Sequence, residues 1–95
     1  NNLVGLIAAY FNNYDTKAGF ITNVSVIKEY QGYGIASILL SNTIKYGKNN
    51  GFISVALEVN INNSNAIKLY EKYGFIATEQ SQEKIKMKSI ILFDK

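Results

Sequence analysis

The feature that most constrains this chain is a strand-like run that leads through a short polar bend into a glycine-rich turn and then a helix. The run ends near Ile27, the bend covers 28–31, and the turn holds Gly32 and Gly34. At such a junction the first backbone N–H groups of the helix lack partners, and with the helix dipole they attract anions. The junction therefore predicts a site for a phosphate-bearing ligand, although glycine in such a turn also serves purely steric needs.

Composition narrows the chemistry that this chain can perform. Its 95 residues suit a single domain, and an apolar fraction of 47% is ordinary for a globular protein. The chain has no Cys and no His, which excludes disulfides, thiolate metal ligands, a Cys nucleophile and the commonest general base. Any proton transfer must use Asp, Glu, Lys, Tyr or water. We expect no metal site.

Charge and hydropathy indicate the surroundings of the protein. A net charge of +3 suits an anionic ligand but is too weak to indicate nucleic acid. Lys84, Lys86 and Lys88 alternate with Ile85 and Met87, which is typical of the solvent face of a strand. No run of about 18 apolar residues could span a membrane, and the first residues lack the basic stretch of a secretory leader. We expect a cytoplasmic protein without membrane or nucleic-acid partners.

Hydrophobic periodicity and turn residues predict the order β-β-α-β-α-β-β. The helices should span Gly34–Tyr46 and Asn65–Tyr73, ended by Gly47 with 49–51 and by Gly74. The central strand–helix–strand unit should be a right-handed parallel crossover, and the outer connections look antiparallel. The class is therefore α/β (α+β), with a mixed, mostly antiparallel sheet. The expected strands are Leu3–Phe11, Gly19–Ile27, Phe52–Val59, Phe75–Gln80 and Lys86–Phe93, with a turn at 12–15 after the first.

One ligand hypothesis for the glycine-rich turn is a dinucleotide fold. The run Gly32–Ser37 is one residue away from G-x-G-x-x-G, and Glu58 follows in the next strand, where a ribose-binding acid is expected. Two observations argue against it. The bend at 28–31 separates the strand from the turn, and a chain this short with a closing hairpin cannot form the doubly wound sheet.

A second hypothesis starts from Gln31. Gln31-x-x-Gly34-x-Ala36 resembles the acetyl-CoA-binding motif Q/R-x-x-G-x-G/A of the GNAT family of N-acetyltransferases. The segment from Asn63 to Phe75 resembles a later motif of the same family, and the strand around 55–59 also fits. The resemblance covers most of 19–75, while the first strand and the last hairpin agree in position only. It extends in part to the bacterial ribosomal-protein alanine N-acetyltransferases.

The resemblance implies a GNAT-like fold that lacks the usual N-terminal strand and helices, so that 1–95 is a single, partial acetyl-CoA-binding domain. It implies direct transfer of an acetyl group from acetyl-CoA to a primary amine, on a small molecule or a peptide N-terminus. The alternatives are a non-catalytic CoA-binding or regulatory module on the same fold, and an interaction fragment with no ligand. An exposed edge strand at Leu3–Phe11 would invite a second copy, so a homodimer is also expected.

The resemblance also assigns cofactor-binding residues. Val24 and Val26 would present backbone groups to the pantetheine arm, on a strand that splays from its neighbour. Many relatives carry Arg or Lys where Gly32 and Tyr33 stand, so backbone donors would do most of the work of holding the CoA diphosphate. The residues of the turn implied in this binding are Gln31, Gly32, Tyr33, Gly34, Ile35, Ala36 and Ser37.

Three further side chains complete the implied site. Tyr70 matches the general acid that protonates the departing thiolate, although core packing would also explain it. Glu58 stands where related enzymes carry a base, and burial among apolar neighbours would raise the pKa of its carboxyl group; an acid facing water at a strand end is the plainer explanation. Asn63 matches a residue that contacts the cofactor, and it is also a good helix cap.

Overall fold

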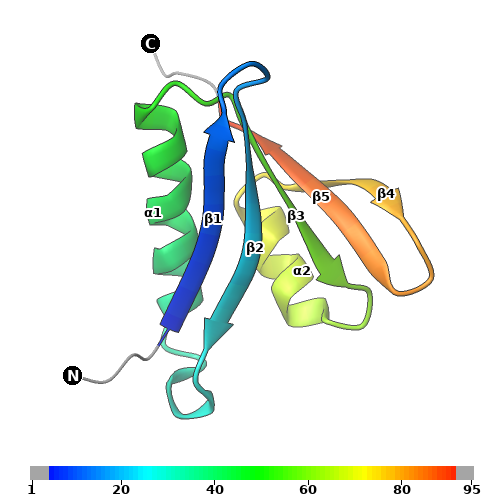
Figure 1. Cartoon of the computed structure of the whole chain (residues 1–95). Helices are drawn as coiled ribbons and strands as arrows, with labels where there is room; N and C mark the ends of the chain where they lie inside the picture. Colours follow the sequence, from blue (N-terminus) through cyan, green and yellow to red (C-terminus); the bar gives the residue numbers. More distant parts are fainter. Residues whose placement is uncertain (1–4, 92–95) are drawn as a thin grey trace.

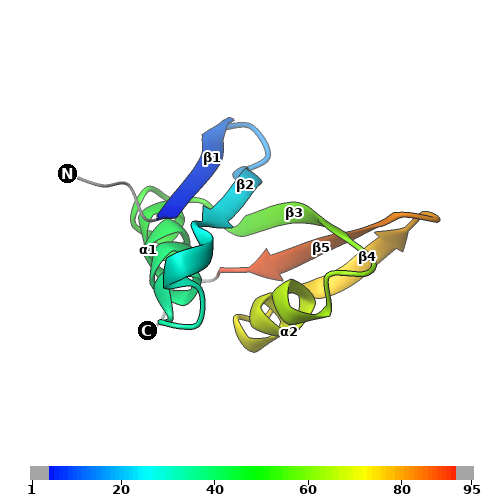
Figure 2. The same ribbon diagram turned by 90° about the horizontal axis from the view of Figure 1, so that it is seen from below.

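A five-stranded sheet carries the fold, and both helices lie against the same face of it (Figure 2). The computed structural model describes residues 5–91. Along the chain the elements are β1 (Gly5–Asn13), β2 (Ala18–Val26), a short 3₁₀ helix η1 (Lys28–Tyr30), α1 (Ile35–Asn49), β3 (Ser54–Asn60), α2 (Ser64–Lys72), β4 (Ile76–Gln80) and β5 (Lys84–Ile90) (Figure 1).

The strand order across the sheet is β1-β2-β3-β5-β4. The β2–β3 pair is parallel, with α1 as its connection, and the other three pairs are antiparallel. This arrangement confirms the predicted element order and the mixed, mostly antiparallel sheet. The bend predicted at 28–31 is confirmed, and η1 lies within it; its 3₁₀ conformation was not predicted from the sequence.

The parallel strands β2 and β3 diverge. Their pairing joins Ala18–Ile21 to Ser54–Leu57 and goes no further along the described strands. From Asn23 to Val26, β2 pairs with β1 alone, and Thr22 lies at an irregularity in that pairing. The predicted splay is therefore confirmed, and it leaves one backbone edge of β2 open toward the helices.

Two predicted boundaries are wrong for physical reasons. Gly47 does not end α1 but lies buried inside it, because a Cβ at this position would come within 2.6 Å of the Phe11 ring. The helix ends at its cap Asn50, next to Gly51 with φ 83°, so the part of the prediction that placed the end at 49–51 is confirmed. The first strand runs on to Asn13, so the turn falls at 14–17 rather than at 12–15. The expected ends of the first and last strands, Leu3 and Phe93, lie outside the described residues.

The core lies between the sheet and the two helices. Side chains alternate along β3: Val55, Leu57 and Val59 are buried toward the helices, while Glu58 is exposed on the opposite face. Burying each Leu or Phe side chain stabilises the fold by about 1.5–3 kcal/mol. The largest fully buried side chains come from four different elements or their ends and are Phe52, Phe75, Leu40, Leu57, Met87 and Val55.

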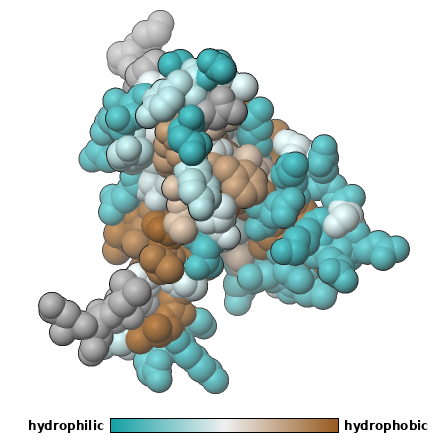
Figure 3. Space-filling model, viewed as in Figure 1, coloured by the Kyte–Doolittle hydropathy of each residue, from teal (hydrophilic) through white to brown (hydrophobic). Residues whose placement is uncertain are grey.

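The outer surface is unevenly polar. Hydrophilic side chains cover the β4–β5 hairpin, whereas hydrophobic side chains gather near the lower ends of α1 and β1 (Figure 3). On β5 the predicted alternation is confirmed, since Met87 is buried and Lys84 and Lys88 are exposed.

Candidate functional site

The glycine-rich turn brings the start of α1 to the open edge of β2. Gly34 is the N-cap of α1 and has a left-handed backbone with φ 79°, which glycine adopts without strain. The first hydrogen bond of the helix runs from the Ile38 N–H to the Gly34 carbonyl, at 3.1 Å. The N–H groups of Ile35, Ala36 and Ser37 precede it and have no partner within the helix. This turn can therefore hold an anion.

A cavity of about 490 Å³, here called the turn groove, opens beside these amides. It lies between β2, the turn and α2. Most residues implicated by the sequence analysis line it together, which confirms that they share one place in the fold. The lining residues are Val24, Ser25, Val26, Tyr30, Gln31, Gly32, Gly34, Ile35, Ala36, Ser37, Asn63, Asn65, Ala66, Leu69 and Tyr70.

The Gln31 side chain braces the turn. Its Nε2 atom donates to the carbonyl of Val26 at 3.0 Å, across the 3₁₀ helix. This bond ties the end of β2 to the residue that starts the sequence motif. Gln31 therefore shapes the groove with its side chain.

Tyr33 lies apart from the other candidate residues. Its side chain is 72% exposed and does not line the turn groove. Its ring lies 6.1 Å from that of Tyr30, which does line the groove. The Tyr33 side chain therefore does not contribute to the groove, and only the backbone of this residue belongs to the turn.

Asn63 caps α2. Its side-chain oxygen accepts a hydrogen bond from the Ala66 N–H at 3.2 Å, so the predicted cap is confirmed. Asn63 also lines the turn groove and the smaller cavity described below. The capping bond fixes the side chain at the edge of both cavities and orients the first turn of α2.

Tyr70 is the central side chain of the site. Only 7% of it is exposed, and its ring packs 5.9 Å from that of Phe75. Burial raises the pKa of the Tyr70 hydroxyl above its ordinary value of 10.0. The phenol is therefore protonated at neutral pH and available as a proton donor. The core packing that the sequence analysis offered for Tyr70 is confirmed, and the residue also borders both cavities.

A second cavity of about 170 Å³, here called the slot pocket, lies where β2 and β3 diverge. Tyr70, Val24 and Asn63 border it as well as the turn groove. The slot pocket thus continues from the turn groove toward the open face of the sheet. Its lining residues are Ile21, Thr22, Asn23, Val24, Leu57, Glu58, Val59, Asn60, Asn63 and Tyr70.

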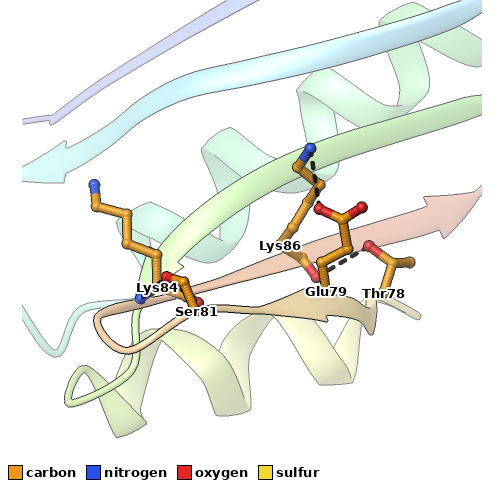
Figure 4. A network of polar contacts seen from close by, with 5 residues as sticks. All are labelled: Thr78, Glu79, Ser81, Lys84 and Lys86. Atoms are coloured by element: carbon orange, nitrogen blue, oxygen red, sulfur yellow. Dashed lines mark hydrogen bonds and ion pairs between the residues drawn. The ribbon is translucent and has the colours of Figure 1, made fainter.

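Glu58 reaches the slot pocket from the open face of the sheet. Its side chain is exposed, so the burial that the sequence analysis considered for it is wrong, and the plainer prediction of an acid facing water is confirmed. Lys86 stands directly opposite Glu58 in the β3–β5 register. The Nζ atom of Lys86 lies 3.6 Å from Oε1 of Glu79 on β4 (Figure 4). Glu58 therefore lies in a solvated row of alternating charges.

Sequence reasoning missed one contact beside the groove. Ser37 is half-buried, and its hydroxyl shares a hydrogen bond with the Tyr73 hydroxyl. No local sequence pattern predicts this contact, because its two residues are far apart in the sequence. It depends on how α1 and α2 lie against the sheet.

A separate groove of about 470 Å³ runs between β1 and α1. Leu39, Phe11 and Tyr46 are among the side chains that line it, and none of the site residues discussed above does. This edge groove follows the outer strand of the sheet. It is therefore distinct from the turn groove and the slot pocket.

Known proteins share this fold and sequence pattern. Residues 1–75 match the model of the acetyltransferase (GNAT) family. An N-alpha-acetyltransferase MAK3 from Arabidopsis thaliana is 37% identical over 78 residues, which cover 81% of this chain and 41% of that protein. The chain spans about two fifths of the length of the curated relatives it matches.

Solved structures agree with the sequence relatives. The ribosomal-protein-S18-alanine N-acetyltransferase from Escherichia coli superposes with a TM-score of 0.85 at 22% identity, over 97% of this chain and 64% of that one. At this identity the likeness concerns the fold. The NatC complex bound to Gag peptide and CoA superposes with a TM-score of 0.83 at 25% identity, over 92% of this chain and 60% of that one. Of the helices in residues 5–91, neither is long and apolar enough to cross a bilayer.

Proposed function

This chain belongs to the acetyltransferase (GNAT) family, and on that premise we propose that it transfers an acetyl group from acetyl-CoA to a primary amine. The observation that carries the proposal is the place of Tyr70, which borders both the turn groove and the slot pocket. A protonated phenol there can serve a reaction whose two substrates arrive from the two cavities. The family membership supports the same chemistry.

The turn groove fits acetyl-CoA as the acetyl donor. Added Cβ atoms at Gly32 and Gly34 would meet nothing within 4 Å, so the space above the turn is open to a diphosphate. The unpaired amides at the start of α1 are suitable donors to its oxygens. The open edge of β2 near Val24 and Val26 offers backbone groups to the amides of a pantetheine arm, as in strand addition.

Acetyl-CoA supplies an activated thioester. The amine nitrogen attacks the carbonyl carbon, a C–N bond forms, and the C–S bond breaks with its electron pair passing to sulfur. Tyr70 donates its proton to that sulfur, which lowers the cost of expelling the thiolate. The proton lost by the amine passes to solvent or to a carboxylate and replaces the one that Tyr70 gave. Because burial raises the pKa of Tyr70, its hydroxyl group stays protonated, and so able to donate a proton, across the neutral pH range.

We assign Glu58 the role of base, directly or through an ordered water. It lines the slot pocket next to Tyr70, on the side opposite the turn groove. Its exposure allows a solvated ammonium group to approach it. Lys86 is its neighbour across the strands, so the proposed base lies beside a cationic side chain on the same face of the sheet.

The acceptor is proposed as a primary amine, either on a peptide N-terminus or on a small molecule. Relatives named N-alpha-acetyltransferases favour the peptide, and the open slot pocket admits both. We propose no metal, since the described residues contain no group of three or more acidic side chains that could hold one. A cytoplasmic location, the absence of nucleic-acid and membrane partners, and a homodimer formed along β1 stay predictions. Light scattering that gives a monomer mass would exclude the dimer.

Two measurements test the proposed function. Acetyl-CoA at 100 times its dissociation constant should stabilise the fold by about 2.7 kcal/mol and raise the melting temperature. A panel of peptides and small amines should then release free CoA thiol, and Tyr70→Phe should abolish most of that release. Binding without thiol release from any amine would instead indicate a CoA-binding module. An unmoved melting temperature at millimolar acetyl-CoA would contradict the proposal altogether.

A further inference from the structure

The Tyr73–Ser37 hydrogen bond joins the end of α2 to the first turn of α1. Ser37 lines the turn groove and is the third residue of α1, while Tyr73 is the C-cap of α2 and lies behind the groove wall. Both side chains are half-buried. The bond therefore spans the two helices that form opposite walls of the groove.

Tyr73 is itself held in place by the framework behind it. Its carbonyl accepts a hydrogen bond of 3.1 Å from the Ser89 hydroxyl, which lies buried on β5. Its N–H donates to the carbonyl of Tyr70 at 3.0 Å. A continuous line of hydrogen bonds thus runs from β5 through the end of α2 to the start of α1. The Tyr73 hydroxyl is the point at which this line reaches α1.

We propose that Tyr73 is a positioning residue that acts through Ser37. This proposal rests on the proposed function. The bond between Tyr73 and Ser37 sets the separation between the anion-binding amides of α1 and the wall of α2 that carries Tyr70. A ligand that must occupy the turn and reach Tyr70 at once depends on that separation. A ligand that occupies the turn alone does not.

The residue types suit this role and allow it to be separated from packing. The Tyr73 ring packs against the core cluster, and phenylalanine would keep that packing while losing the hydroxyl. Ser37→Ala removes the same bond from the other helix and leaves the backbone amide in place. The two substitutions therefore test one bond from both of its ends.

The experiment measures the affinity of Tyr73→Phe, Ser37→Ala and the double variant for two ligands, acetyl-CoA and ADP. Each single variant should bind acetyl-CoA about five-fold more weakly, as expected for one lost hydrogen bond, and the double variant should be no weaker than either. ADP, which carries a diphosphate but no pantetheine arm, should bind all four proteins equally. Ser37→Thr keeps a hydroxyl at this position, so this variant should bind acetyl-CoA with the affinity of the wild-type protein.

Thr43→Val is the matched control. Thr43 is buried in the same helix, and within residues 5–91 its hydroxyl bonds to the Leu39 carbonyl, at 2.9 Å and away from the turn groove. This variant should lose thermal stability without any change in the affinity for acetyl-CoA. It reports what the loss of a hydroxyl in α1 does by itself.

Three results would overturn the assignment. They are unchanged acetyl-CoA binding in Tyr73→Phe, additive losses in the double variant, or an equal loss of ADP binding, which would mean that the turn itself has collapsed. Wild-type protein that binds neither ligand would overturn the proposed function and this assignment with it. Wild-type binding combined with any of the three results would overturn the assignment alone.

Discussion

Gly34 and Gly51 flank α1 with nearly the same left-handed backbone, φ 79° and 83°, but of the two only Gly34 lines the turn groove. A Cβ would meet nothing within 4 Å at either position, so a substitution to alanine adds backbone strain and no clash within the protein. The two glycines are therefore a natural pair for separating the role of the turn in folding from its role in binding.

Gly34→Ala and Gly51→Ala should each lower the free energy of unfolding by about 1–2 kcal/mol, because both force an L-residue into the left-handed region. Gly34→Ala should also weaken acetyl-CoA binding at least about ten-fold, since its methyl group enters the space above the free amides. Urea unfolding and isothermal titration calorimetry measure the two effects. Equal affinity of the two variants for acetyl-CoA would contradict the placement of the diphosphate at this turn.

Tyr70→Phe should lower kcat by about 100-fold while leaving the affinity for acetyl-CoA nearly unchanged. The phenyl ring keeps the contact with Phe75, and only the proton donor is lost. Steady-state kinetics with CoA thiol detection measure this split. Tyr46→Phe removes a hydroxyl from an exposed tyrosine outside both cavities and should have no effect. If Tyr70→Phe kept the kcat of the wild-type enzyme, Tyr70 could not be the proton donor of the reaction.

The raised pKa of Tyr70 gives stability a definite dependence on alkaline pH. The folded protein holds this proton more tightly than the unfolded chain, whose tyrosine has the ordinary pKa of 10.0. The associated stabilisation is therefore complete below the unfolded pKa and is lost as the pH rises through the folded pKa. Urea unfolding between about pH 8 and about pH 11 should show a smaller alkaline loss in Tyr70→Phe than in wild type. Identical slopes would contradict burial of the phenol.

Asn63 has a capping role and a proposed contact with the cofactor, and two substitutions separate them. Asn63→Ala removes the bond to the Ala66 N–H and should lower stability by about 1 kcal/mol. Asn63→Ser keeps a capping oxygen, so stability should return while acetyl-CoA affinity remains reduced. Thermal melts and calorimetric titration on the same samples measure both quantities. Full recovery of affinity in Asn63→Ser would leave the cap as the whole role of this residue.

Glu58→Gln should lower the rate of acetylation most at neutral pH, where an amine acceptor is largely protonated and needs a base. The amide is similar in size, and the exposed position predicts little change in stability. A pH profile of kcat/KM that approaches that of wild type at high pH would support the role of a base. A constant ratio between the two enzymes at every pH would indicate that Glu58 only orders the site.

The sequence predicted the elements well because each carries its own local signal. The alternation of lysines with Ile85 and Met87 identified β5, and the capping oxygen of Asn63 marked the start of α2. The prediction that Gly47 ends the first helix was wrong for a physical reason. Glycine serves both as a helix terminator and as a place for close packing, and only the position of the Phe11 ring decides between the two.

The candidate site was predictable where a motif runs along the chain and not where it depends on tertiary contacts. The turn from Gln31 to Ser37, with the exception of Tyr33, and the side chain of Tyr70 do line one groove. Local sequence left Glu58 with two alternatives, burial or exposure, and it gave no sign of the bond between Ser37 and Tyr73. The first depends on which face of the sheet the helices cover, and the second on the distance between two helices that contact the sheet side by side.

The divergence of β2 from β3 has a consequence for the ligand-free protein. Beyond Ile21, β2 has no strand partner on its β3 side among the described residues, so the amide hydrogens that face this open edge should exchange quickly with deuterium. An occupant that pairs with this edge would extend the hydrogen-bonded network through the segment near Val24 and slow that exchange. The open edge of β2 is thus a weak point of the ligand-free sheet, and an occupant paired with it should make this segment more rigid.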